Sequence, residues 1–200
     1  MTSREKAFQR LSLKAAECTL CSRMAEQTAV LSRHNGSIES DLVFIAEAPG
    51  RFGSGRTGIP FSGDKSGDNF ETLIDHAGLS RKDIFITNAV LCNPLSEGCN
   101  SRPTSREIDN CSPYLKSVLE LVRPKLVVTL GAVGLDAINR LGNTRFKLSE
   151  TVARPQVMEQ WTLLPLYHPS PRVANWKRPL NQQKRDFLRI QRLLKKLPPA

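Results

Sequence analysis

Four short apolar runs separated by amphipathic stretches constrain the fold of this chain more than any other feature. The runs cover residues 41–46, 84–90, 125–130 and 161–167. Each is rich in Val, Ile, Leu or Phe, as buried strands are. The first runs into Glu-Ala-Pro-Gly, and the third is bracketed by Pro124 and Gly131, as strands that lead into loops are. Strands that alternate with helices favour a parallel sheet covered on both faces. We therefore expect one α/β domain over residues 1–200, with a central, mainly parallel four-stranded sheet flanked by helices.

Helical patterns fill the segments between these runs. Residues 68–77 place their apolar side chains on one face of a helix. Thr104 and Glu107 form a capping box that opens a helix through residue 119. Pro113 is expected to kink or divide this helix, because proline cannot donate the backbone hydrogen bond of a helix interior.

Two further patterns complete the expected architecture. Residues 132–141 form a short helix, and Pro165 in the fourth apolar run indicates an edge position or a strand end. A helical stripe near the C-terminal end is expected to pack on the core, not on a membrane or a partner. The stripe consists of Phe187, Ile190, Leu194 and Leu197.

The charge of the chain bears on its partners. Twenty-nine Lys and Arg stand against 19 Asp and Glu, which gives a net charge of +10 and a pI near 9.7. Nucleic acid is the favoured partner of such a chain, although a solvated basic surface would also explain the balance. No apolar run approaches the roughly 18 residues of a membrane span, and the first residues lack the apolar stretch of a secretory signal. We expect a soluble, cytoplasmic protein that contacts no membrane.

The five cysteines are not expected to form disulfides, because the cytosol keeps thiols reduced. Cys18 and Cys21 form a C-x-x-C pair, and Cys92, Cys99 and Cys111 follow much later in the chain. Four thiolates that converge on an iron–sulfur cluster or on zinc are one interpretation. Unrelated buried thiols are the other, and composition alone favours neither.

Three polar side chains lie where predicted strands end. Glu47 follows the first run, Asn88 lies near the end of the second, and His168 follows the fourth. Singly, they could serve as a helix cap, a turn residue and a partner of backbone groups. Ligands bind beyond the carboxyl ends of the strands in open parallel sheets. The three together therefore favour a site at that edge.

A Gly-rich loop over residues 49–64 follows Glu47. It matches neither the P-loop nor the dinucleotide-binding pattern, which argues against nucleotide hydrolysis and dinucleotide binding. Its glycines would let backbone N–H groups approach a phosphate or a base closely. Phe61 within this loop is placed to stack on a flat ring near the strand ends.

Several segments resemble motifs of the uracil-DNA glycosylase superfamily, and most closely its iron–sulfur-containing family 4. They occur in the family's order between about Cys18 and Arg172, which makes the resemblance specific. Ala-Glu-Ala-Pro-Gly at 46–50 is similar to the first catalytic motif, and His-Pro-Ser-Pro at 168–171 to the second. The others are the Cys18 and Cys21 pair, Gly-Ile-Pro-Phe-Ser-Gly at 58–63, Ile-Thr-Asn-Ala-Val-Leu-Cys at 86–92 and Cys-Ser-Pro-Tyr-Leu at 111–115.

The sequence also departs from the family 4 pattern. Ala46 stands where that family usually has Gly, and residues 51–56 are basic and Gly-rich where it commonly has more acids. Residues 56–67 resemble family 5, whose substrate range is broader, and residues 168–172 resemble the single-strand-selective relatives. The resemblance leaves open a broader range of deaminated bases and a preference for single or double strands.

The resemblance implies a monomeric glycosylase of base excision repair that flips uracil out of DNA and hydrolyses its N-glycosidic bond. In this interpretation Glu47 activates water and stabilises the sugar cation, and His168 stabilises charge on the uracil O2. The resemblance also assigns Phe61 and Asn88 to uracil binding, and Cys18, Cys21, Cys92 and Cys111 to a [4Fe–4S] cluster. Ser62, Ser170 and Arg172 are candidates for DNA binding, although ordinary surface-loop positions would explain them equally well. Cys99 competes with Cys92, because it also precedes Cys111 in the chain.

Two rival functions belong to other classes. One is a superfamily relative that binds uracil-DNA without turnover or becomes covalently trapped on it. Such relatives carry a basic, His-containing insertion near the first motif, and residues 51–58 contain no His. The other is a nucleic-acid-binding module whose fold is held together by a bound metal. That function would leave the polar residues at three strand ends unexplained.

The expected product is an intact strand that bears an abasic site. Strand cleavage would need an activated amine that forms a Schiff base with the sugar. Lys65, the lysine nearest to the strand ends, lies beyond the Gly-rich loop, so we expect no Schiff base.

Overall fold

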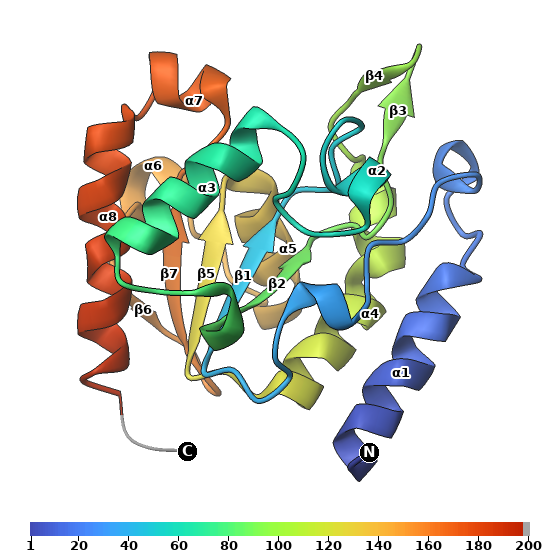
Figure 1. Cartoon of the computed structure of the whole chain (residues 1–200), viewed down its shortest axis with the longest axis horizontal. Coiled ribbons are helices and arrows are strands. Elements are labelled where there is room, and N and C mark those ends of the chain that lie inside the picture. Colours follow the sequence, from blue (N-terminus) through green and yellow to red (C-terminus); the bar gives the residue numbers. More distant parts are fainter. Residues whose placement is uncertain (198–200) are drawn as a thin grey trace.

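A five-stranded sheet lies between two layers of helices in the computed structural model, which describes residues 1–197 (Figure 1). The strand order is β2-β1-β5-β7-β6, and the first four strands are parallel. Their bounds are Leu42–Ala46 for β1, Phe85–Asn88 for β2, Leu126–Leu130 for β5 and Thr162–Leu166 for β7. These four confirm the predicted parallel sheet and the α/β class.

The fifth strand was not predicted. It is the two-residue β6, Gln156–Val157, which pairs antiparallel with the start of β7 at the sheet edge. Two residues carry no readable periodicity, so the pattern could not reveal it. Pro165 lies in the part of β7 beyond this pairing, where its carbonyl accepts from the Ala153 N–H at 2.8 Å. Because that side of Pro165 faces away from β5, its missing N–H removes no bond between the two central strands.

Alternation along the strands divides the core into two layers. Val43 and Ile45 face one layer, and Leu42 and Phe44 face the other. The helices α1, α4 and α5 cover the first face, and α3 and α8 cover the second (Figure 1). Their bounds are Ser3–Ala16, Ser105–Val122, Ala132–Gly142, Lys65–His76 and Leu180–Leu194, in that order. The predicted C-terminal stripe packs on the second face, with Phe187 and Ile190 fully buried and Leu194 and Leu197 partly buried.

The prediction that Pro113 divides its helix was wrong. The capping box of Thr104 and Glu107 is formed, and α4 runs unbroken from Ser105 to Val122. Proline at 113 leaves the Asp109 carbonyl without its usual backbone donor. The Ser112 hydroxyl donates to that carbonyl at 2.9 Å, so the lost helical bond is replaced by a side chain.

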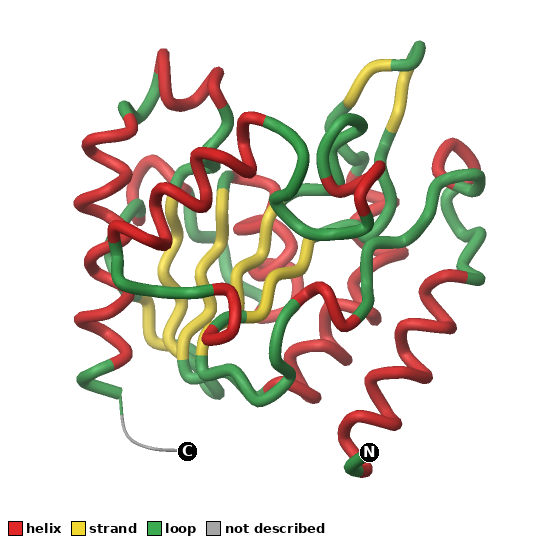
Figure 2. Tube along the Cα trace, viewed as in Figure 1, coloured by secondary structure: helices red, strands yellow, loops and turns green. Residues whose placement is uncertain are grey.

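Short elements gather beyond the carboxyl ends of the parallel strands (Figure 2). They are α2 (Ser54–Thr57), α7 (Pro171–Trp176) and a hairpin of β3 (Leu95–Ser96) and β4 (Cys99–Asn100). The helix α6 (Leu148–Thr151) precedes β6, and the 3-10 helix η1 (Ser22–Met24) follows the C-x-x-C pair. Within residues 1–197, no helix has both the length and the apolar character to cross a membrane.

Candidate active site and cysteine cluster

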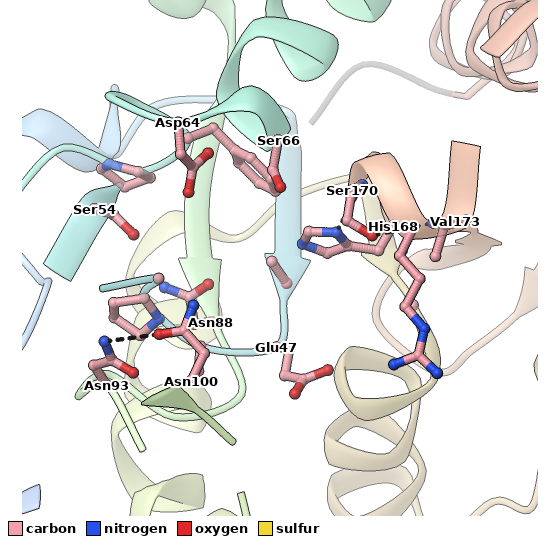
Figure 3. A pocket seen from close by; sticks show the side chains of 18 of the residues that line it. Glu47, Ser54, Asp64, Ser66, Asn88, Asn93, Asn100, His168, Ser170 and Val173 are labelled. Carbon is pink, nitrogen blue, oxygen red and sulfur yellow. Dashed lines mark hydrogen bonds between the residues drawn. The ribbon is translucent and has the colours of Figure 1, made fainter. Parts of the chain in front are cut away.

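A cavity of about 630 Å³ opens at the carboxyl ends of the parallel strands, which is a typical size for a ligand site. Three of the predicted polar residues, Glu47, Asn88 and His168, line it together. Figure 3 shows His168 on one side, Asn88 on the other and Glu47 between them. This arrangement follows the strand order, because β1 lies between β2 and the β5–β7 pair.

Glu47 and Asn88 are neighbours because the pairing of β1 and β2 continues past the strand ends. The Ala89 N–H donates to the Ala46 carbonyl at 2.9 Å, and the Val90 N–H donates to the Glu47 carbonyl at 3.2 Å. Burial raises the pKa of the Glu47 carboxyl above its ordinary 4.5, and the charge of Arg102 opposes that rise. The carboxylate is therefore poorly solvated, as a group that accepts a proton in catalysis should be.

The imidazole of His168 is held as a neutral ring with a defined tautomer. The Ser170 backbone N–H donates to Nδ1 at 3.1 Å, so Nδ1 carries no proton and Nε2 carries one. Burial lowers the pKa of His168 to about 4, although the charge of Asp64 opposes this shift. Part of the ring still faces the cavity. His168 is thus poised to donate from Nε2 without being an imidazolium.

Gly131 keeps the space beside His168 open. It follows β5 with a φ of 93°, and a Cβ at this position would lie 3.3 Å from the Cβ of His168. A side chain there would be strained by the left-handed backbone and would press on the imidazole. The end of the central strand therefore needs glycine for the His168 ring to keep its position.

Asn88 presents its amide to the cavity from a buried position, with only 5% of the residue exposed. No hydrogen bond to this amide from another group in residues 1–197 is present, so both of its polar atoms can serve a ligand. Nearby, Asn93 and Asn100 are hydrogen-bonded to each other at 3.2 Å (Figure 3). Asn100 also accepts from the Arg51 N–H at 2.9 Å, which ties the β3–β4 hairpin to the Gly-rich loop.

Phe61 lines the cavity between Phe70 and His168. Its ring stacks on Phe70 with centroids 4.3 Å apart, and its centroid lies 5.6 Å from that of His168. The backbone at Phe61 is left-handed, with a φ of 50°. Arg81 donates to the carbonyls of Pro60 and Phe61 at 2.6 and 2.9 Å, which holds this strained turn in place. One face of Phe61 is therefore covered by Phe70, which leaves the ring as a rigid wall of the cavity.

The three residues predicted to contact DNA are not placed alike. Ser170 and Arg172 line the cavity, and Ser170 is also the N-cap of α7. Ser62 does not line it. Ser62 instead lines a separate, shallow hollow, together with His34 and Arg81.

Sequence reasoning missed several polar residues of the cavity. Asp64, Ser66, Asn93, Asn100 and Tyr167 all line it. Asp64 accepts from the Gly67 N–H at 2.9 Å as the N-cap of α3, and its charge reaches His168. The capping pattern before residues 65–76 could have identified Asp64 as a cap. Nothing local indicates that this cap also faces the cavity.

Four of the five cysteines line a second, small cavity of about 30 Å³ between the segment after α1, the segment after β2 and α4. They are Cys18, Cys21, Cys92 and Cys111, the four that the resemblance selects. Cys99 is exposed on β4 and does not line this cavity. The Leu91 N–H points at the Cys111 sulfur at 3.3 Å, and the Asn110 amide points at the Cys21 sulfur at 3.5 Å. Apolar side chains such as Met24 and Val90 complete the lining.

A partly buried ion pair joins the C-x-x-C segment to α4. Arg23 binds both carboxylate oxygens of Glu107 at 2.6 Å, although the two residues lie 84 positions apart. This guanidinium lowers the pKa of Glu107 to about 2. Arg23 also donates to the Ser101 hydroxyl and to the Arg102 carbonyl, which adds the end of the β3–β4 hairpin to the same assembly.

Comparison with known proteins agrees with this geometry. Residues 34–195 match the Uracil DNA glycosylase superfamily. The chain is 31% identical over 171 residues to a Type-4 uracil-DNA glycosylase from Archaeoglobus fulgidus, with 82% of each chain covered. It is 35% identical over 156 residues to a Type-5 uracil-DNA glycosylase from Pyrobaculum aerophilum, covering 70% of this chain and 66% of that protein. A Type-4 enzyme from Thermotoga maritima is 28% identical over 176 residues, with 88% of each chain covered.

Proposed function

Because this chain belongs to the uracil DNA glycosylase superfamily, we propose that it excises uracil from DNA by hydrolysing the N-glycosidic bond. The observation that carries this proposal is the single cavity that Glu47, Asn88, Phe61 and His168 line together. A base inside a duplex cannot reach such a cavity, so the nucleotide must first be extruded from the stack. The product is an abasic site in an intact strand.

Phe61 and Asn88 would recognise the base. The wall formed by Phe61 can stack on the uracil ring, and the Asn88 amide can both donate and accept. Uracil offers O4 as an acceptor and N3–H as a donor, whereas cytosine offers the opposite pair. An amide oriented for uracil therefore leaves its dipoles opposed to cytosine, at a penalty of about 1–3 kcal/mol for each unsatisfied group.

His168 and Glu47 would carry the chemistry. Bond cleavage leaves negative charge on the uracil and positive charge on the sugar. The Nε2–H of His168 is free to donate to the uracil O2 as that charge grows, because Nδ1 is occupied by the Ser170 N–H. Glu47, directly after the strand that pairs with the strand of Asn88, would orient water and stabilise the sugar cation.

Ser170 and Arg172 at the rim of this cavity would contact the DNA beside the extruded nucleotide, with Arg172 filling the vacated space. Ser62 lies outside the cavity, so a phosphate contact there would involve a more distant part of the strand. The net charge of +10 supports such contacts along the backbone.

The four cysteines that share the small cavity would hold a [4Fe–4S] cluster. No three His, Cys, Asp or Glu side chains in the described part of the chain are grouped to hold a metal ion. N–H donors aimed at two of the sulfurs and the apolar lining suit a cluster. Its role would be to brace the loops beside the cavity, and no step of bond cleavage needs it.

A panel of labelled oligonucleotides, each with one uracil, hypoxanthine, xanthine or thymine in single-stranded or duplex form, tests the function. We expect cleavage at uracil only after alkali treatment, because the enzyme itself leaves the strand intact. A protein–DNA adduct that survives denaturation would instead indicate the covalently trapped relative. Binding without any product would indicate the nucleic-acid-binding module, and trapping by borohydride would indicate an attacking amine.

The acidic side of the pH–rate profile is expected to report Glu47 and not His168. Burial raises the pKa of Glu47, so its carboxylate is lost at higher pH than in a free glutamate. His168, with a pKa near 4, stays neutral from pH 5 to 8, a range that we choose around the ordinary His pKa of about 6.5. Single-turnover rates across this range should fall on the acidic side in the wild type, and Glu47→Gln should flatten that fall. An inflection near 6.5 that disappears in His168→Ala would contradict this assignment.

A further inference from the structure

Trp176, the last residue of α7, leaves 82% of its surface in solvent. Isolated exposed apolar side chains are ordinary and need no function. Of the large exposed apolar side chains, Leu13 and Val157 belong to α1 and β6, which do not line the main cavity, whereas Phe52 and Trp176 belong to segments that border it. Trp176 is in the short helix that borders it.

Trp176 shares a helix face with two residues of the cavity wall. It follows Val173 by three positions and Arg172 by four, and both of these line the cavity. Residues with these spacings lie on the same side of a helix. At a rise of about 1.5 Å per residue, the indole lies about 5 to 6 Å further along the helix than these two. Bases along one strand are about 3.4 Å apart, so a strand that follows this helix would bring the indole to one or two nucleotides from the nucleotide held in the cavity.

The helix that carries Trp176 is fixed at both ends. Before it, the Asn69 amide donates to the Pro169 carbonyl at 2.8 Å. After it, Arg178 makes a paired contact with Asp186 of α8 at 2.7 and 2.8 Å. An aromatic side chain on such a support loses little conformational entropy when it binds a flat ligand.

The surroundings of Trp176 suit a nucleic acid strand. The helix α7 contains no acidic residue, and Arg172 and Lys177, which precede and follow Trp176 in the sequence, are exposed cations. Aromatic side chains within a cationic track bind successive bases by stacking, with little dependence on sequence. Extrusion of one nucleotide also removes a stacking partner from its neighbour, which leaves one face of that neighbouring base uncovered.

We propose that Trp176 stacks on a DNA base next to the extruded nucleotide and so replaces the stacking that extrusion removes. This inference rests on the proposed function, because the extruded nucleotide defines where the strand lies. It adds a DNA-contacting residue outside the cavity, one that acts on the affinity for the extruded state and not on bond cleavage.

Tryptophan fluorescence provides a direct test, because the chain has only two tryptophans. The other one, Trp161, immediately precedes β7 at the opposite end of the sheet from the cavity. The probe is a single-stranded oligonucleotide with one 2′-fluoro-2′-deoxyuridine, whose fluorine resists cleavage by destabilising the sugar cation. Stacking should quench the emission of the wild type and of Trp161→Phe alike, and Trp176→Phe should bind with little quenching. Equal quenching in Trp176→Phe and the wild type would overturn the proposal.

Removing the neighbouring base provides the second test. Trp176→Ala should raise the Kd for the probe by about 5- to 150-fold, the range expected for one base–aromatic stack. An abasic residue placed one or two positions from the fluorinated nucleotide should weaken the wild type and remove most of its advantage over Trp176→Ala. An advantage that stays the same at every abasic position would show that Trp176 contacts no base.

The two proposals can fail independently. If no oligonucleotide in the panel loses a base while quenching still depends on Trp176, the proposed glycosylase activity is wrong and the stacking contact stands. If Trp176→Ala and the wild type release uracil at equal rates and bind the 2′-fluoro probe with equal Kd, the proposed activity stands and the stacking contact is wrong.

Discussion

Replacing His168 with alanine is expected to slow uracil release by about 10²- to 10³-fold in single-turnover experiments. This is the effect expected when an enzyme loses one preorganised hydrogen-bond donor to a developing charge. The ring is held by the Ser170 N–H on Nδ1, so Nε2 is its only donor toward the cavity. The pKa of about 4 keeps this ring neutral at physiological pH. The variant should bind the 2′-fluoro probe nearly as well as the wild type, because the donor acts mainly when charge develops.

His76 offers a matched control for this experiment. It lies in the last turn of α3 and is exposed, outside the cavity lining. His76→Ala should release uracil at the wild-type rate. Asn88→Ala provides a second comparison, because it should reduce the preference for uracil over cytosine in addition to the rate. A His168→Ala protein that folds normally by circular dichroism and keeps its full rate would remove His168 from the mechanism.

Replacing Cys111 with serine is expected to abolish iron binding and to lower thermal stability sharply. Cys111 is enclosed between the Leu91 N–H and the other three thiols, and burial raises the pKa of its thiol to about 12. A bound metal centre would stabilise such a buried thiol as a thiolate. Loss of one ligand should therefore release the constraint that joins the C-x-x-C segment to α4. Iron content, visible absorption and the melting temperature measure the effect.

Cys99→Ser is the matched control, since Cys99 is exposed on the hairpin and outside the small cavity. This variant should keep its iron, its colour and its melting temperature. Full iron content in Cys111→Ser, or its loss in Cys99→Ser, would contradict the ligand assignment. A colourless wild type that binds zinc would contradict the cluster itself.

Much of the fold could be predicted because the spacing of apolar residues over short stretches of sequence indicates the strands and helices. Each parallel strand lies within one of the predicted apolar runs, and the capping box before α4 is formed as expected. The position of Glu47, Asn88 and His168 also follows from sequence, because parallel strands end on the same edge and these residues come directly at those ends. The predictions that were wrong concern local exceptions. Ser112 compensates for Pro113 in α4, and β6 is too short to carry a pattern.

What the sequence determined by itself is therefore the sheet, its helical layers and the edge at which polar residues meet. Only the tertiary structure decided which side of the Gly-rich loop faces inward, since Asp64 lines the cavity and Ser62, two residues earlier, does not. It also placed Cys92, and not Cys99, with the other thiols, a choice that the family resemblance had indicated but that cysteine spacing alone had left open. The physical reason is that these choices depend on contacts between distant segments. Arg23 and Glu107 lie 84 residues apart, and their ion pair helps to hold the cysteine segments together. Periodicity describes which face of an element is apolar, but it carries no information about the partner that a loop will meet.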